Sequence, residues 1–207
     1  GDFYDYVDLP DGAVGFVLGD VAGKGPPAAL LSAMMQGMFA AQAARSEPPS
    51  TTISRVNLAL YRRGIESRFV TLMYGALEDN GRLTYCNAGH NPPLVVSGGE
   101  LRLLEVGGVP MGVLPTYPFE EGETDLRSGD LLAAFSDGIP EATRGGEFFD
   151  DDRLRQALIE LASDAHPRGF AERVAAHLVE ARRTEDAVHW LLVAAEERRA
   201  TSDPHGA

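Results

Sequence analysis

The stretch VGFVLGDVAGKGPPAALL, residues 14–31, decides how the rest of the chain is interpreted. Its apolar start, from Val14 to Leu18, is typical of a buried strand. The glycines of the GDVAGKG segment that follows favour a sharp loop, and Pro26 and Pro27 suit the first turn of a helix. Residues 28–44 are rich in Ala, Leu and Met and almost without charge, so we expect this helix to be largely buried. The stretch therefore predicts a strand, a glycine loop and a buried helix.

Outward from this stretch, the hydrophobic pattern predicts strands in the middle of the chain and helices around them. Helices are expected at about 50–63, 151–162 and 168–183, and strands at 69–77, 82–87, 94–96, 101–104, 130–135 and 188–194. Turn residues at 79–81 and 97–99 favour hairpins, whereas 107–118 is interpreted as a loop. Antiparallel strands with helices in separate blocks predict an α+β fold rather than a parallel doubly wound one.

The composition indicates one folded domain. The 207 residues are 44% hydrophobic and 24% charged, which is close to globular averages. The single cysteine, Cys86, has no internal partner, so a buried thiol in a reducing compartment such as the cytoplasm is expected. No apolar run approaches the length of a membrane helix. We expect one domain over residues 1–195 and a polar tail over 196–207.

The acidic residues are informative through their placement. A net charge of -13 disfavours nucleic acid as a partner, because affinity for phosphate backbones comes from Lys and Arg. Three aspartates, Asp2, Asp20 and Asp137, lie beside glycine or a turn where a strand is expected to end. Mg²⁺ and Mn²⁺ prefer such carboxylate-rich sites. Taken singly, however, an aspartate beside glycine is usually only a turn, so the two interpretations stay open at this point.

The order of several motifs carries a family resemblance. The motifs are GDFYDY at 1–6, GDVAGKG at 19–25, FVTL at 69–72, NAGHNPP at 87–93, GD at 129–130 and SDGIPEA at 136–142. In this order and spacing they resemble the SpoIIE/RsbU-like bacterial branch of the metal-dependent protein phosphatases (PPM, type 2C). The resemblance runs over nearly the whole chain.

This resemblance implies a four-layer α-β-β-α sandwich of two mainly antiparallel sheets flanked by helices, with two Mn²⁺ or Mg²⁺ ions at one end. Asp20 is similar to the carboxylate that bridges the ions, with the Val21 carbonyl beside it, and Asp2 and Asp137 are similar to other aspartates of the centre. Asp20 and Asp137 are the implied catalytic residues. The implied reaction is hydrolysis of phosphoserine or phosphothreonine by a metal-activated water. The implied substrate is a phosphorylated anti-sigma-factor antagonist of a partner-switching pathway.

The chain departs from the family pattern in three places. Glu185 and Asp186 stand where paired aspartates, the first a metal ligand, are usual, so either could be the ligand. An impaired second metal site would give the alternative function, a pseudophosphatase that binds and signals. Lys24 replaces a usual histidine and could contact the substrate phosphate or only face solvent. The strand that usually precedes the first motif is missing, which leads us to expect an upstream sensory or dimerising module.

Two further features have structural interpretations. His90 opens a rigid loop in the NAGHNPP motif and is not an expected metal ligand. Asp150 to Asp152 precede a helix, where carboxylates cap free amides.

A third possible function, hydrolysis of small phosphate esters, predicts no preference for a folded protein substrate.

Overall fold

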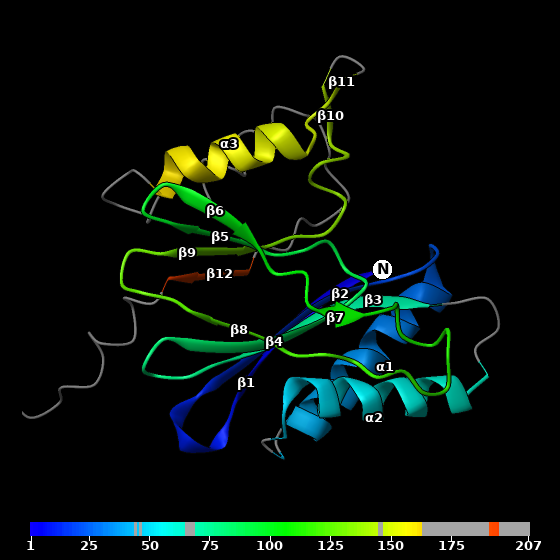
Figure 1. The fold of residues 1–207 in the computed structure, drawn as a ribbon. Helices are drawn as coiled ribbons and strands as arrows, with labels where there is room; N and C mark the ends of the chain where they lie inside the picture. Colours follow the sequence, from blue (N-terminus) through cyan, green and yellow to red (C-terminus); the bar gives the residue numbers. More distant parts are fainter. Residues whose placement is uncertain (44, 46, 65–68, 145–146, 163–190, 195–207) are drawn as a thin grey trace, which may run out of the picture. The chain divides into compact units, whose positions relative to one another are not determined.

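The computed structural model describes residues 1–43, 45, 47–64, 69–144, 147–162 and 191–194 (Figure 1). They form two compact units that alternate along the chain. The first unit consists of residues 1–93 and 104–125, and the second of residues 94–103 and the described part of 126–207. The chain therefore leaves the first unit, returns to it and leaves it again.

The first unit is built on a six-stranded sheet with the order β1-β2-β3-β4-β7, in which β8 also pairs with β4. Its strands are β1 (Asp2–Asp8), β2 (Val14–Val21), β3 (Val70–Leu77), β4 (Arg82–Ala88), β7 (Gly107–Gly108) and β8 (Gly122–Asp125). A short 3-10 helix, η1 (Pro10–Gly12), joins β1 to β2. Every pairing is antiparallel except that of β4 with β7.

Two helices, α1 (Pro26–Ala43) and α2 (Pro49–Arg62), pack on this sheet. The buried side of α2 includes Ile53, Val56 and Leu60, as the sequence predicts, and Gly64 follows the helix with a φ of 58°. This positive φ is the left-handed conformation in which glycine ends helices at little cost.

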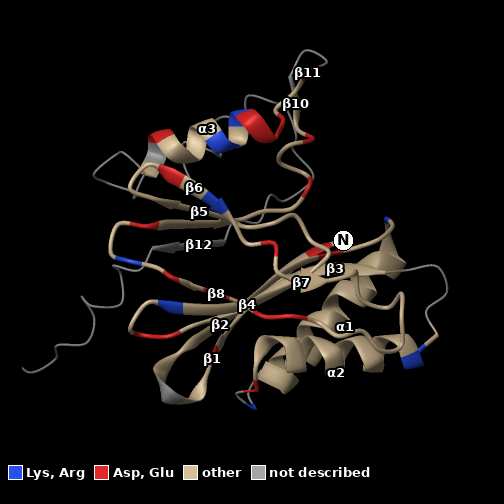
Figure 2. Ribbon diagram, viewed as in Figure 1, with Lys and Arg blue, Asp and Glu red and all other residues tan. Residues whose placement is uncertain are grey.

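The prediction of a largely buried α1 is wrong for one side of the helix. Leu31, Met35 and Phe39 are buried in the core of the first unit, but Leu30 is 73% exposed. The helix carries no charged side chain (Figure 2), although only part of its surface is buried against the sheet and α2. Of the helices that the structure describes, none is both long and apolar enough to cross a membrane.

The second unit contains a four-stranded sheet with the order β12-β9-β5-β6. Its strands are β5 (Leu94–Ser97), β6 (Glu100–Leu103), β9 (Leu131–Ala134) and β12 (Leu191–Ala194), all antiparallel to their neighbours. Helix α3 (Asp151–Ala162) packs on it through Leu154 and Leu158. A small ribbon of β10 (Thr143–Arg144) and β11 (Glu147–Phe148) completes the described part. The helix predicted over 168–183 lies outside the described residues.

The predicted α+β class, with two mainly antiparallel sheets flanked by helices, is confirmed. The loop expected at 107–118 contains the two-residue strand β7, and β1, β8 and the β10–β11 ribbon were not predicted. These strands are short or rich in polar residues, so they lack the apolar alternation by which strands are identified. The stacking of the two sheets and the single domain over 1–195 stay predictions.

Candidate metal centre

Asp2 and Asp20 lie opposite each other on neighbouring strands. Asp2 begins β1 and Asp20 is the next-to-last residue of β2, and the antiparallel register pairs these two positions. Asp2 was expected where a strand ends, which is wrong, but antiparallel pairing brings the start of β1 to the end of β2. Directly opposed residues point to the same face, with Cβ atoms about 5 Å apart. The two carboxyl groups share a hydrogen bond.

The electrostatics of this pair suit a cation. Burial, the hydrogen bond with Asp2 and the negative charge of Asp2 together raise the pKa of Asp20 to about 6, while the Gly1 amino group opposes the shift. A raised pKa shows that a second negative charge at this position is unfavourable. A divalent cation removes that repulsion and takes carboxylate oxygens as ligands. The donor set therefore fits the Mn²⁺ or Mg²⁺ that the sequence implies.

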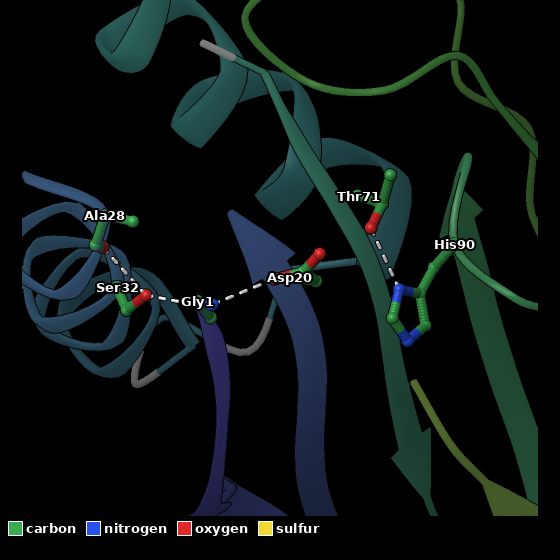
Figure 3. Close-up of polar contacts among 6 residues, drawn as sticks. All are labelled: Gly1, Asp20, Ala28, Ser32, Thr71 and His90. Carbon is green, nitrogen blue, oxygen red and sulfur yellow. Dashed lines mark hydrogen bonds and ion pairs between the residues drawn. The ribbon is translucent and has the colours of Figure 1, made fainter. Parts of the chain in front are cut away.

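Helix α1 holds the backbone beside this pair (Figure 3). The Ser32 hydroxyl lies 2.6 Å from the Gly1 carbonyl oxygen and 3.0 Å from the Ala28 carbonyl oxygen, and its single proton can be donated to either. The Gly1 nitrogen lies 3.4 Å from Oδ1 of Asp20, and the Val21 amide donates to the Gly1 carbonyl at 3.3 Å. The strand ends that carry the carboxylates are thus attached to the first turns of α1.

The glycine loop after β2 has the predicted form. Gly23 and Gly25 have φ values of 107° and 79°, which side-chain-bearing residues rarely adopt. Lys24 lies between them and is exposed to solvent. The Gly25 carbonyl then accepts hydrogen bonds from the amides of Ala28 and Ala29 at 3.1 and 3.2 Å, which starts α1.

Thr71 and His90 extend the polar site to the next strands and were not predicted to do so. Thr71 on β3 is the register partner of Asp20, and its Oγ1 lies 3.0 Å from Nδ1 of His90 (Figure 3). His90 is only 6% exposed. The amide of His90 donates to Oδ1 of Asn87 at 2.7 Å, and Nδ2 of Asn87 donates to the His90 carbonyl at 3.0 Å. Two hydrogen bonds thus hold the backbone of the loop at His90, and its rigidity stays a prediction.

The other predicted ligands lie elsewhere in the chain. Asp137 belongs to the second unit, where it follows β9, is exposed and accepts the Glu141 amide on its carbonyl at 3.0 Å. Glu185 and Asp186 lie outside the described residues. Within the described ranges, no three His, Cys, Asp or Glu side chains gather closely enough to hold a metal ion. The proximity of Asp137 to Asp20 stays a prediction.

The capping role expected before α3 is confirmed. Oδ1 of Asp150 accepts the Arg153 amide at 2.9 Å, so this carboxylate caps the first turn of the helix. Asp151 and Asp152 lie in that same first turn, where negative charge is favourable.

Comparisons with known proteins agree with the fold. The chain is 29% identical over 163 residues to the phosphoserine phosphatase RsbU of Bacillus subtilis, an alignment that covers 77% of this chain and 48% of RsbU. The chain thus spans about half the length of this curated relative. The solved RsbU and RsbW domains of a Mycobacterium tuberculosis protein superpose with a TM-score of 0.74 at 24% identity, over 86% of this chain and 50% of that one. RsbX, solved with magnesium, superposes with a TM-score of 0.68 at 17% identity, over 92% of this chain and 85% of that one.

The sequence profile of the stage II sporulation protein E (SpoIIE) family matches residues 10–195, which is most of the chain. This match includes the GDVAGKG, FVTL, NAGHNPP and SDGIPEA motifs that carry the resemblance. The chain therefore belongs to the SpoIIE family of PP2C-type phosphatase domains.

Proposed function

We propose that this protein is a metal-dependent serine/threonine protein phosphatase that hydrolyses phosphoserine or phosphothreonine. The observation that carries the proposal is the Asp2–Asp20 carboxylate pair, which lies at the end of β2 directly before the glycine loop. Membership of the SpoIIE family and the likeness to a phosphoserine phosphatase support the same reaction.

In this proposal the carboxylates hold two Mn²⁺ or Mg²⁺ ions. The residues that would hold them are Asp2, Asp20, the Val21 carbonyl, Asp137, and either Glu185 or Asp186. Such ions, when bound, lower the pKa of water and stabilise negative charge on phosphoryl oxygens. Asp20 and Asp137 would be the catalytic residues of this centre, while the hydrogen bonds of Gly1 with Ser32 and Val21 keep the Asp20 strand end in place.

We further propose that the substrate is a phosphorylated anti-sigma-factor antagonist in the cytoplasm. An upstream sensory or dimerising module is proposed to control the activity. The family resemblance supports this choice. The structure adds a positively charged side chain within the glycine loop. Lys24 is exposed there and is a candidate contact for the phosphate of the substrate.

The test is hydrolysis of a phosphoserine peptide with and without Mn²⁺. We expect turnover that requires Mn²⁺ and is lost in Asp20→Asn. Asp8→Asn is the matched control, because Asp8 lies on the same face at the other end of β1 and should retain turnover. Binding of Mn²⁺ by the wild type without any turnover would refute the enzyme and favour the pseudophosphatase.

A second arm of the experiment tests the substrate class. The rate with a phosphorylated antagonist protein is compared with the rates with the phosphopeptide and with p-nitrophenyl phosphate. A clear preference for the folded protein supports the proposed substrate, whereas equal kcat/KM values for all three favour a hydrolase of small phosphate esters.

A further inference from the structure

Four polar side chains lie in a row across the ends of the first strands of the sheet. The register pairs Asp2 with Asp20 and Asp20 with Thr71, and a bridge between Leu72 and Gly89 brings His90 beside β3. Residues that are directly opposed on antiparallel strands point to the same face. Thr71 therefore presents its hydroxyl on the face that carries the two carboxylates.

The Thr71 hydroxyl has capacity for a second hydrogen bond. Its Oγ1 lies 3.0 Å from Nδ1 of His90, and within the described part of the chain it makes no other hydrogen bond. A threonine hydroxyl offers one proton and two lone pairs, so one contact does not satisfy it. Thr71 is partly exposed, whereas His90 is buried, so a ligand can reach the hydroxyl from the side of Asp20.

His90 is held as a fixed partner for this hydroxyl. Asn87 is 3% exposed, and its side chain forms hydrogen bonds with both the backbone amide and the backbone carbonyl of His90. Nδ2 of Asn87 also reaches the Leu104 carbonyl at 3.4 Å. These two hydrogen bonds hold the His90 backbone in place, and the imidazole contacts Thr71 from this position.

The chemistry of the substrate determines which way the Thr71–His90 hydrogen bond runs. The oxygens of a phosphate monoester dianion accept hydrogen bonds and have no proton to donate. Thr71 can bind such an oxygen only with its own proton, and Oγ1 must then accept the hydrogen bond from His90. Nδ1 of His90 consequently carries a proton in the productive arrangement.

We propose that Thr71 donates a hydrogen bond to a phosphoryl oxygen of the substrate, and that His90 is a positioning residue whose Nδ1–H donates to Thr71 and fixes its hydroxyl. This inference rests on the proposed phosphatase function and assigns a phosphate contact to the strand next to Asp20. His90 acts only through Thr71 and does not touch the substrate.

Binding of inorganic phosphate to the Mn²⁺-loaded protein tests the inference directly. Calorimetry should show that Thr71→Val, which keeps the shape but lacks the hydroxyl, weakens phosphate binding about ten- to a hundredfold. Thr71→Ser restores most of the affinity. Thr84→Val is the matched control: Thr84 lies on the neighbouring strand β4, opposite Ala76 rather than beside Asp20, and this variant should bind phosphate as the wild type does.

The His90 variants test the direction of the hydrogen bond. His90→Asn retains an N–H donor near the position of Nδ1 and should keep most of the affinity, whereas His90→Leu should lose about three- to tenfold. The double variant Thr71→Val/His90→Leu should be no weaker than Thr71→Val alone, because His90 acts through Thr71. Thermal unfolding of each variant identifies any that fails to fold.

The outcomes separate this inference from the proposed function. Unchanged phosphate affinity in Thr71→Val, or losses that multiply in the double variant, overturns the inference even if the wild type hydrolyses phosphopeptides. Phosphate binding that depends on Thr71 in a protein without turnover supports the contact and refutes the phosphatase. A wild type that binds no phosphate overturns the inference, and one that also hydrolyses no phosphopeptide overturns both.

Discussion

Replacing Asn87 by alanine should destabilise the protein strongly, because one buried side chain makes three hydrogen bonds. Asn87 is 3% exposed and joins the His90 amide, the His90 carbonyl and the Leu104 carbonyl at 2.7, 3.0 and 3.4 Å. A typical hydrogen bond contributes about 1 kcal/mol net, and a buried group left unpaired costs about 1–3 kcal/mol. Two good hydrogen bonds, one weaker bond and the backbone groups left unpaired together lead us to expect that the free energy of unfolding falls by about 3 kcal/mol.

Thermal unfolding followed by circular dichroism measures this loss. For a protein of this size, about 3 kcal/mol corresponds to a fall in Tm of about 6–12 °C. The control is Asn80→Ala: Asn80 makes two hydrogen bonds, at 3.0 Å to Glu78 and 2.8 Å from the Arg82 amide, but it is exposed. Water replaces those partners, so we expect a loss of about 0.5 kcal/mol. Equal losses in the two variants would refute the argument from burial.

Three further predictions follow from local geometry. Cys86 is fully buried, and this burial, together with a smaller effect of a nearby glutamate, raises the pKa of its thiol to about 12. At a pH of about 8 a thiol reagent should therefore react with Cys86 only after the protein is unfolded in urea. Fast labelling of the native protein would contradict this. Asp150 has a φ of 59° and caps α3, so Asp150→Ala should cost about 2 kcal/mol in urea unfolding, whereas Asp150→Asn, which keeps a capping oxygen and tolerates this φ, should cost little. A Cβ at Gly19 would lie 2.8 Å from the Thr71 carbonyl oxygen, so Gly19→Ala should lower the free energy of unfolding by about 1–3 kcal/mol. Gly37 lies in an open position of α1, so Gly37→Ala should raise the free energy of unfolding by about 0.5–1 kcal/mol. The same sign of ΔΔG for both variants would show that the contact at Gly19 is relieved by small shifts.

Those parts of the fold that depend on local sequence could be predicted. The turn at 79–81 has the expected form, with Gly81 at a φ of 91°, and the buried side of α2 follows from its spacing of apolar residues. By contrast, β7 consists of two glycines, and its existence depends on pairing with Asn87 and Ala88 of β4. No local pattern contains that pairing.

The candidate site divides in the same way. The motif around Asp20 indicated a strand end followed by a glycine loop, and the structure confirms both. The contact of Thr71 with His90 joins residues 19 positions apart through the register of β3 and β4, which a single sequence does not specify. The FVTL motif did place a hydroxyl within an otherwise apolar strand, and that polar exception was the available signal.

The alternation of the two units along the chain has a consequence for synthesis on the ribosome. Strand β8 pairs with β4 only after the chain has passed through β5 and β6 of the other sheet. The first sheet therefore cannot be complete before residue 125 has left the exit tunnel, and β5 must wait still longer for its second partner, β9. During this interval the nascent chain exposes two unfinished sheet edges at once, which makes it a candidate client for chaperones that bind at the tunnel exit.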